Sequence, residues 1–440
     1  MNAAAPIERI AALHARLAPS LGGGPTWARR RGEALGTLLA RGLPDRRDEN
    51  WKYLDHALLA EYPFDAAPRA PADAARLAPL LLPLEGARRI VLADGRFDAA
   101  LSSNLAASGL EVADLGRLLE RDPEAALNLL RAPGTGADDR YALLADAFAS
   151  GGVLLRIAAG RQLEEPLYLV HLATAAEPAV HQTRVVIEAG ANARCTLVEH
   201  FVAAGEAAVL GNLAADIALA EGAVVSHVRL HRHSATAAQV ETWTARLAAK
   251  SRYEQHLLAL GGRLLRSNLS LTLDGAGSAC RLDGLFLADS DRQVDLLTQV
   301  AHAGAATETM QDYRGIAAGR GRGGFNGRIT VQPTARGANA SQSSRNLLLT
   351  PLAEINARPQ LEILVDEVQC RHGATTGTLD ADQVFYLVSR GLDPAAARAL
   401  LTYAFCRDVI GRVPVAAVRS AAESLVAASL PGRDLIRGLA

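Results

Sequence analysis

Residues 188–201 read EAGANARCTLVEHF: a short glycine turn is followed by a run of alternating apolar and polar residues, Arg194–Phe201. This unit recurs at Glu221-Gly222-Ala223 before Val224–Leu230, and at Asp274-Gly275-Ala276 before Ala279–Leu287. Repeated short strands with glycine turns and no helices between them predict an all-β solenoid or sandwich. More than 200 residues, from 153 to 378, continue without a sandwich-like boundary, which favours a parallel β-helix.

Both ends of the chain have helical periodicity. Helices are expected within residues 1–150, at Ile7–Leu17, Arg31–Leu39 and Asp139–Ala149, together with a short strand, 89–93. After the solenoid at 151–380, a helical region at 381–440 begins with helices at 383–389, 395–410 and 413–428. Such helices are expected to cap the solenoid and cover its exposed edge.

Composition excludes several classes of protein. Forty-six Lys and Arg residues face 47 Asp and Glu residues, and this balance argues against binding nucleic acid or an anionic membrane. No run of 18 apolar residues is present, and Glu8 and Arg9 interrupt the apolar core that a signal peptide needs. A cytoplasmic protein is therefore expected.

Four cysteines, Cys195, Cys280, Cys370 and Cys406, are widely spaced and form no CxxC pair. This spacing excludes a zinc ribbon, a thioredoxin-type redox pair and a self-contained ferredoxin.

Gly319-Arg-Gly321-Arg-Gly-Gly324 formally matches the dinucleotide motif GxGxxG. That motif requires a helix after it, but Phe325–Val331 has the pattern of a strand. A Gly/Arg loop between strands is therefore the favoured interpretation. The phosphate loop of an ATPase is absent as well.

His227, His231 and His233 alternate along one expected strand, so their side chains would share one face. Imidazoles in this arrangement could bind a metal, but no carboxylate or thiolate in the segment completes a ligand set. A polar outer wall of the solenoid is the preferred interpretation.

Cys370 and His372 also share one strand face, with about 7 Å between their positions. A thiolate and a neutral imidazole suit iron, zinc or a sulfur-transfer step. Two ligands cannot hold a cluster alone, so a partner chain would have to supply the others. A buried structural cysteine beside a structural histidine is the alternative.

A series of ordered motifs lies near the C-terminus: Phe325-Asn-Gly-Arg-Ile-Thr-Val, Ala340-Ser-Gln342, Asn346-Leu-Leu-Leu, Arg358-Pro-Gln-Leu-Glu362-Ile, Cys370-Arg-His372-Gly-Ala-Thr, Leu379-Asp380 and Phe385-Tyr-Leu-Val-Ser-Arg-Gly391. These motifs resemble the SufD branch of the SufB/SufD family, whose members are subunits of the Suf scaffold complex for iron–sulfur cluster assembly. Glu49–Tyr53 (ENWKY) is similar to an aromatic-basic motif of the family. The SufB branch usually has N-terminal cysteines, whereas this chain has none before Cys195.

The resemblance implies a right-handed parallel β-helix between helical ends, paired through its end with a SufB-like subunit. A nascent iron–sulfur cluster would form at that interface, with His372 as the stronger ligand and Cys370 as the secondary one. Arg358 and Arg371 would balance the cluster's negative charge.

The resemblance further implies that residues 383–428, including Phe385, Tyr386 and Arg390, dock a SufC-like ABC-type ATPase, which alone would bind ATP. A cysteine desulfurase would deliver sulfur indirectly, chiefly through the SufB-like subunit. Reduced flavin in the complex and a homodimer without the SufB-like subunit are further expectations. The subunit itself would be non-catalytic.

Two alternatives belong to other classes. A purely structural partner of the SufB-like and SufC-like subunits would make no metal contact. A β-helix polysaccharide lyase would need clustered carboxylates, but the close acidic pair Asp289-Ser-Asp291 has the pattern of a turn.

Overall fold

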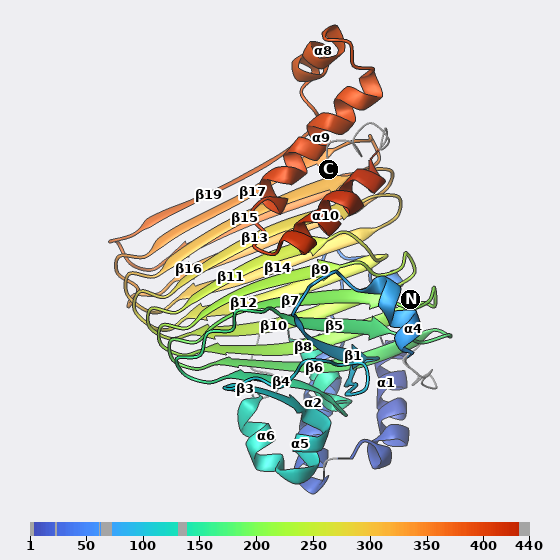
Figure 1. Cartoon of the computed structure of the whole chain (residues 1–440), viewed down its shortest axis with the longest axis vertical. Coiled ribbons are helices and arrows are strands. Elements are labelled where there is room, and N and C mark those ends of the chain that lie inside the picture. Colours follow the sequence, from blue (N-terminus) through green and yellow to red (C-terminus); the bar gives the residue numbers. More distant parts are fainter. Residues whose placement is uncertain (1–3, 23, 61, 63–72, 131–138, 431–440) are drawn as a thin grey trace.

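The computed structural model describes residues 4–22, 24–60, 62, 73–130 and 139–430. Its centre is a β-solenoid of about eight turns, formed by two sheets whose strands alternate along the chain (Figure 1). The β-helix prediction is confirmed, and the two sheets run almost entirely in parallel pairing.

Sheet A contains β1, the short β2 and the odd-numbered strands from β5 onward. In chain order they are β1 (Arg88–Ala93), β2 (Arg96–Phe97), β5 (Leu167–Ala173), β7 (Arg194–Ala203), β9 (Val224–His231), β11 (Arg252–Ala259), β13 (Ala279–Ala288), β15 (Glu308–Ala317), β17 (Asn339–Leu348) and β19 (Gln369–Gly377).

Sheet B contains β3 and the even-numbered strands from β4. They are β3 (Leu110–Asp114), β4 (Gly152–Ile157), β6 (Ala179–Ala189), β8 (Val209–Leu219), β10 (Ala238–Leu247), β12 (Leu264–Leu273), β14 (Gln293–His302), β16 (Arg322–Val331) and β18 (Glu354–Ile363). Two strands from before residue 151, β1 and β3, thus extend the sheets of the solenoid.

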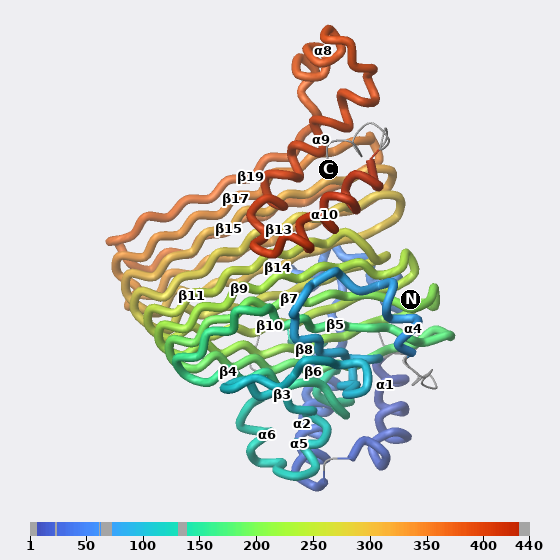
Figure 2. The backbone as a smooth tube through the Cα atoms, in the orientation of Figure 1, coloured from blue at the N-terminus to red at the C-terminus, as the bar shows by residue number. Residues whose placement is uncertain are grey.

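Each full turn adds about 30 residues. In sheet B, for example, Leu264 pairs with Gln293, which pairs with Arg322, at intervals of 29 residues. Two ten-residue strands and two turns fill this length, which explains why the sequence has no hexapeptide period. The backbone tube in Figure 2 shows the resulting stack of similar coils.

Turns of successive coils also stack and hydrogen-bond to one another. One backbone N–H per coil donates to the next turn, as Gly222 does to Ala249 at 2.9 Å and Ala306 does to Arg336 at 2.8 Å. The donor residue has a left-handed backbone, with φ of 70° at Gly222 but also 53° at Ala306. A side chain at such a position costs conformational energy that glycine avoids.

We predict that Ala306→Gly raises the free energy of unfolding by about 0.5–1 kcal/mol, since glycine relieves the left-handed strain. Ala305→Gly is the matched control: Ala305 is also exposed but lies outside the left-handed region. The control should lower stability slightly, because glycine adds freedom to the unfolded chain. Urea unfolding of both variants measures the difference, and equal effects would refute the explanation.

The interior of the solenoid is an apolar core that runs from β1 to β18. Alternate side chains of each strand face this core, while the others face outward. On sheet A the outward side chains form a second apolar layer, which includes Val228, Leu258 and Leu285. On sheet B they meet the N-terminal helices at Leu210 and Val240.

The N-terminal helices cover one end of sheet B (Figure 1). The expected helices and strand are confirmed as α1 (Ala4–Leu17), α2 (Gly24–Arg41), α7 (Arg140–Ala147) and β1. The remaining short helices of this region are α3 (His56–Ala60), α4 (Ala74–Leu77), α5 (Leu115–Arg121), α6 (Pro123–Leu129) and the 3-10 turns η1 (Ala18–Ser20) and η2 (Ala78–Leu80).

Three C-terminal helices match the predicted segments: α8 (Ala381–Ser389), α9 (Pro394–Ile410) and α10 (Ala416–Ser429). The expectation that they cap the end of the solenoid is wrong, because α9 and α10 lie across the outer face of sheet A (Figure 1). Tyr403, Cys406 and Val426 bury their side chains in the apolar layer of that face. The layer offers a larger apolar surface than a strand edge, so the helices pack there.

Arginines fix these helices to sheet A. Arg412 donates to Asp283 at 2.7 Å and to Asp312 at 2.6 Å, while Arg314 donates to the Phe405 carbonyl at 2.7 Å. Asp283 is fully buried, so loss of Arg412 would leave its charge with Arg281, at 2.8 Å, as the remaining guanidinium donor. The C-terminal half of α9 is therefore held rigidly on the solenoid.

Histidines predicted for an outer wall lie inside the solenoid. His227 and His231 are fully buried, so that interpretation is wrong; His233 follows the end of β9. Glu241 from β10 lies 3.3 Å from His231, and Glu199 from β7 lies 3.5 Å from His227. Alternation alone does not say which face points inward, and the acidic neighbours come from other strands.

Buried neutral histidines predict that the fold weakens in mild acid. Burial lowers the pKa of His200 to about 3 and of His256 and His302 to about 4, and that of His231 well below its usual value. Between about pH 6.5 and 4 the unfolded chain therefore binds more protons than the folded chain, and stability falls as pH falls. Each such group contributes a loss of at most about 1.4 kcal/mol per pH unit. Burial raises the pKa of Glu241, which acts in the opposite sense.

Urea unfolding midpoints at pH 7.5, 6.5 and 5.5 measure this effect. We expect a steep fall below pH 6.5, and a midpoint that stays constant to pH 5.5 would contradict the assignment of buried neutral histidines.

Candidate functional site at the open end of the solenoid

The solenoid is open at its C-terminal end. β18 and β19 are the last strands of their sheets, and each pairs on one side only. Val365, Val368 and Cys370 are only partly buried against the end of the inner core. Leu352, in the turn before β18, is 70% exposed, and Leu364, in the turn after β18, is 50% exposed. Unpaired strand edges and an uncovered apolar core together favour pairing with another chain.

Cys370 and His372 lie together on the inward face of β19. They stack over Ala340 and Gln342 of β17, which are both buried in the interior. Cys370 is partly buried, and burial raises the pKa of its thiol. His372 is exposed because no coil follows. A thiol and an imidazole are thus presented at the open end, where groups from a partner chain can reach them.

Arg358 and Arg371 do not share this face. Arg371 alternates with Cys370 and His372 and donates to the Ser341 hydroxyl at 3.1 Å on the outer side. Arg358 points outward from β18 and forms an ion pair with Glu49. Within this chain, therefore, neither guanidinium is directed toward the side chains of Cys370 and His372.

Phe385, Tyr386 and Arg390 lie on or next to α8, which projects beyond the solenoid (Figure 1). Phe385 is 72% exposed and Tyr386 is 57% exposed, and none of the residues of α8 is buried. The Arg390 guanidinium lies 5.3 Å from the ring centre of Tyr386. Two exposed aromatic side chains on a protruding helix are typical of a protein contact.

The predicted docking segment 383–428 is thus divided. Most of α10 and the second half of α9 bury their apolar side chains against sheet A, so those side chains are not available to a partner. α8 is the part whose large apolar side chains remain exposed.

Residues 46–56, here called the strap, were only partly anticipated by the ENWKY motif. The strap crosses the outer face of sheet B and contacts each of the strands β12, β14, β16 and β18. Trp51 is buried with Arg266 4.4 Å from its ring centre, Gln293 donates to the Tyr53 carbonyl at 2.8 Å, Asn326 donates to Asn50 at 3.0 Å, and Arg358 pairs with Glu49. The strap therefore joins four coils and reaches the open end.

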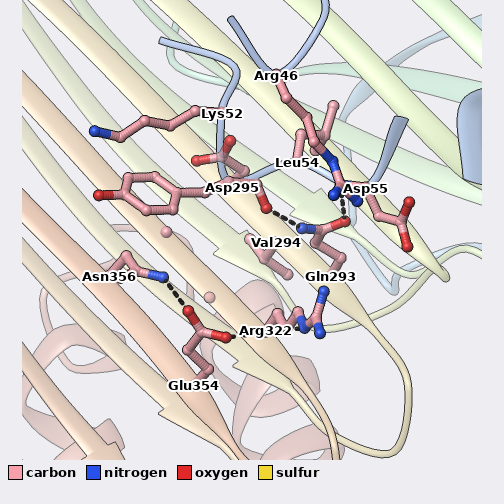
Figure 3. A pocket seen from close by; sticks show the side chains of 13 residues that line it. Arg46, Lys52, Leu54, Asp55, Gln293, Val294, Asp295, Arg322, Glu354 and Asn356 are labelled. Atoms are coloured by element: carbon pink, nitrogen blue, oxygen red, sulfur yellow. Dashed lines mark hydrogen bonds and ion pairs between the residues drawn. The ribbon is translucent and has the colours of Figure 1, made fainter. Parts of the chain in front are cut away.

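A small polar hollow of about 190 Å³ lies between part of the strap and β14, β16 and β18 (Figure 3). Arg46 and Lys52 lie on its strap side, while Arg322 and Glu354 lie on the strands. Lys52 points away from Arg322 in Figure 3, so these positive charges do not converge on one point.

The GxGxxG match and the acidic pair Asp289-Ser-Asp291 both include a turn between strands. Gly319 has φ of 63° in the turn before β16, and the rest of the GxGxxG match runs into that strand. A Cβ on Gly321 would come within 1.8 Å of the Ala288 carbonyl, so these glycines permit close stacking of coils. Asp289 and Asp291 flank the left-handed residue Ser290 in another turn. Neither motif is followed by a helix.

Two features are absent from the described residues. In the described part of the chain, no group of three or more His, Cys, Asp or Glu side chains is arranged to hold a metal ion. Among the same residues, no helix is long and apolar enough to cross a membrane.

Comparisons with known proteins agree with this architecture. The family model described as "SUF system FeS cluster assembly, SufBD core domain" matches residues 171–405, more than half of the chain. The chain therefore belongs to the SufBD family. Within the family it is a SufD-like iron–sulfur cluster assembly protein.

Three curated relatives illustrate the similarity. The iron-sulfur cluster assembly protein SufD of Escherichia coli (strain K12) is 29% identical over 90% of this chain and 92% of its own length. A SufBD family protein of Synechocystis sp. is 30% identical over 88% of this chain and 87% of its own length. SufD of Bacillus subtilis (strain 168) is 27% identical over 64% of each chain.

Proposed function

We propose that this chain is a non-catalytic scaffold subunit whose open solenoid end pairs with a SufB-like subunit. The main support is the pair of terminal strands, β18 and β19, which have free edges over an uncovered inner core. A related solenoid would continue both sheets and bury Leu352 and Leu364. A second copy of this chain has the same edges and would pair in the absence of the SufB-like subunit.

A nascent iron–sulfur cluster is assembled at this interface as the cargo of the complex. His372 supplies an imidazole and Cys370 a second ligand, while the partner contributes the others. The two side chains share the inward face of the last strand, which supports this role. Arg358 on β18 and Arg371 on β19 point to the outer side of the solenoid, so they contact the partner rather than the cluster.

An ABC-type ATPase similar to SufC docks on α8. Phe385 and Tyr386 supply the apolar contact, and ATP is bound only by that partner. Residues 378–380 alone separate α8 from β19, the strand of Cys370 and His372. A movement of the ATPase would therefore act directly on the open end and shift it between paired and separated states. Sulfur arrives from a cysteine desulfurase indirectly, through the SufB-like subunit; reduced flavin in the complex remains a prediction.

We predict that His372→Ala lowers cluster yield in the purified complex at least several-fold without changing its subunit composition. His372 is exposed at the open end, so its loss removes a ligand but little packing. Cys370→Ala should lower the yield less, and the double variant should lower it most. Iron and acid-labile sulfide per complex, measured after anaerobic co-purification, provide the readout.

A purely structural subunit would tolerate these changes. Unchanged iron and sulfide in the Cys370/His372 double variant would therefore favour the structural alternative. Arg371→Ala serves as the matched control, because Arg371 neighbours both residues on β19 but faces outward.

For the docking helix, we predict that Phe385→Ala combined with Tyr386→Ala abolishes co-purification of the ATPase but retains the SufB-like subunit. Neither side chain is buried in this chain, so the variant should keep its thermal midpoint. Leu39→Ala, which removes an exposed apolar side chain on α2, is the control. Retention of the ATPase by the double variant would refute docking through α8.

A further inference from the structure

A buried polar column lies directly below His372. Its register partner on β17 is Gln342, and the register partner of Gln342 on β15 is Gln311. All three strands direct these side chains toward the solenoid interior, and Gln342 is only 2% exposed. A buried side-chain amide is costly unless it is hydrogen-bonded, so two stacked glutamines beside the apolar inner core require a physical reason.

Gln342 is held firmly on its lower side. Its Nε2 donates to Gln311 Oε1 at 3.3 Å, and the Thr298 hydroxyl donates to that same oxygen at 2.8 Å. The other atom of the amide, Gln342 Oε1, is buried and has no hydrogen-bond partner among the described residues. A buried amide oxygen is costly to leave without a donor.

Gly327 of β16 makes room for this amide. A Cβ at Gly327 would come within 2.0 Å of Gln342 Nε2, and its backbone φ is outside the left-handed region. The glycine is thus needed for space rather than for backbone conformation. Gly327 and Gln342, which belong to separate motifs in the sequence, form one cradle below the open end.

We propose that Gln342 positions His372: its Oε1 accepts a hydrogen bond from one imidazole N–H and selects one tautomer of the ring. The other ring nitrogen then keeps its lone pair and is free to face the open end. Glutamine is suited to this role because its oxygen orients a neutral imidazole without adding charge. The use of that free nitrogen as an iron ligand rests on the proposed function, while the tautomer selection does not.

The test is the tautomer of His372 in the full-length chain. With 15N-labelled histidine at pH 8, long-range 1H–15N spectra distinguish Nδ1–H from Nε2–H, and His372→Gln identifies the signal. We expect one tautomer in the unmodified chain and a mixture in Gln342→Met, which preserves shape but has no acceptor oxygen. Gln342→Glu should restore one tautomer, because a carboxylate accepts the same N–H and Gln311 can turn its unpartnered Nε2 toward it.

Controls separate positioning from a general structural effect. Ser341→Ala changes the neighbouring outward residue of β17 and should leave the tautomer unchanged. Signals of the other histidines report whether each variant folds. If Gln342→Met does not fold, Gln342→Asn replaces it, since asparagine withdraws the oxygen by one methylene. A single, unchanged tautomer in Gln342→Met, or in Gln342→Asn where it replaces that variant, would overturn the proposal. A mixture of tautomers in the unmodified chain would overturn it as well.

Cluster content in the complex provides a separate readout. Loss of a group that orients a metal ligand typically weakens metal binding about 10-fold or more, so Gln342→Met should lower retained iron accordingly and Gln342→Glu should recover it. If substitution of Gln342 changes the tautomer, but substitution of neither Gln342 nor His372 changes the iron content, the positioning role stands and the ligand role fails.

Discussion

Pairing of each coil with the next is the interaction on which this protein depends. A single coil of about 30 residues cannot bury its own inner face, so its stability comes from the coils on either side. The stacked turns add a backbone hydrogen bond at each step, and the glycines keep the coils close enough to form it. The same dependence leaves the last coil with an unfinished face at β18 and β19.

The outer faces of the two sheets are covered by helices, whereas the open end is exposed. Helices from both termini cover the outer faces: the N-terminal helices pack on sheet B, and α9 with α10 pack on sheet A. The open end has no such cover among the described residues, although only three residues separate α8 from β19. Covering the faces leaves the open end as the place where unpaired strand edges are exposed.

Polar groups in the interior are arranged for particular contacts. Arg229 donates to Glu241 at 2.6 Å and to Gln255 at 3.0 Å, so its buried charge is paired. Nearer the open end the interior becomes neutral and polar, with Thr298, Gln311 and Gln342 below His372. The strap ties these last coils together from outside. The open end is therefore supported from within and from without, which favours a fixed geometry for its side chains.

Local residue patterns determined the elements of this protein, while the tertiary structure decided which of them meet. Glycine turns and alternating strands predicted the solenoid, and the alternation of Cys370 with His372 placed both on one face, because turn chemistry and strand parity are local properties. The parity of His227 could not show that its face is the inner one. The contact of Gln342 with Gln311, and its place below His372, depend on the length of a coil. The outward positions of Arg358 and Arg371 also depend on it, as does the packing of α9 and α10 on a face of the solenoid. The reason is that only the stacking of coils brings residues about 30 positions apart into contact.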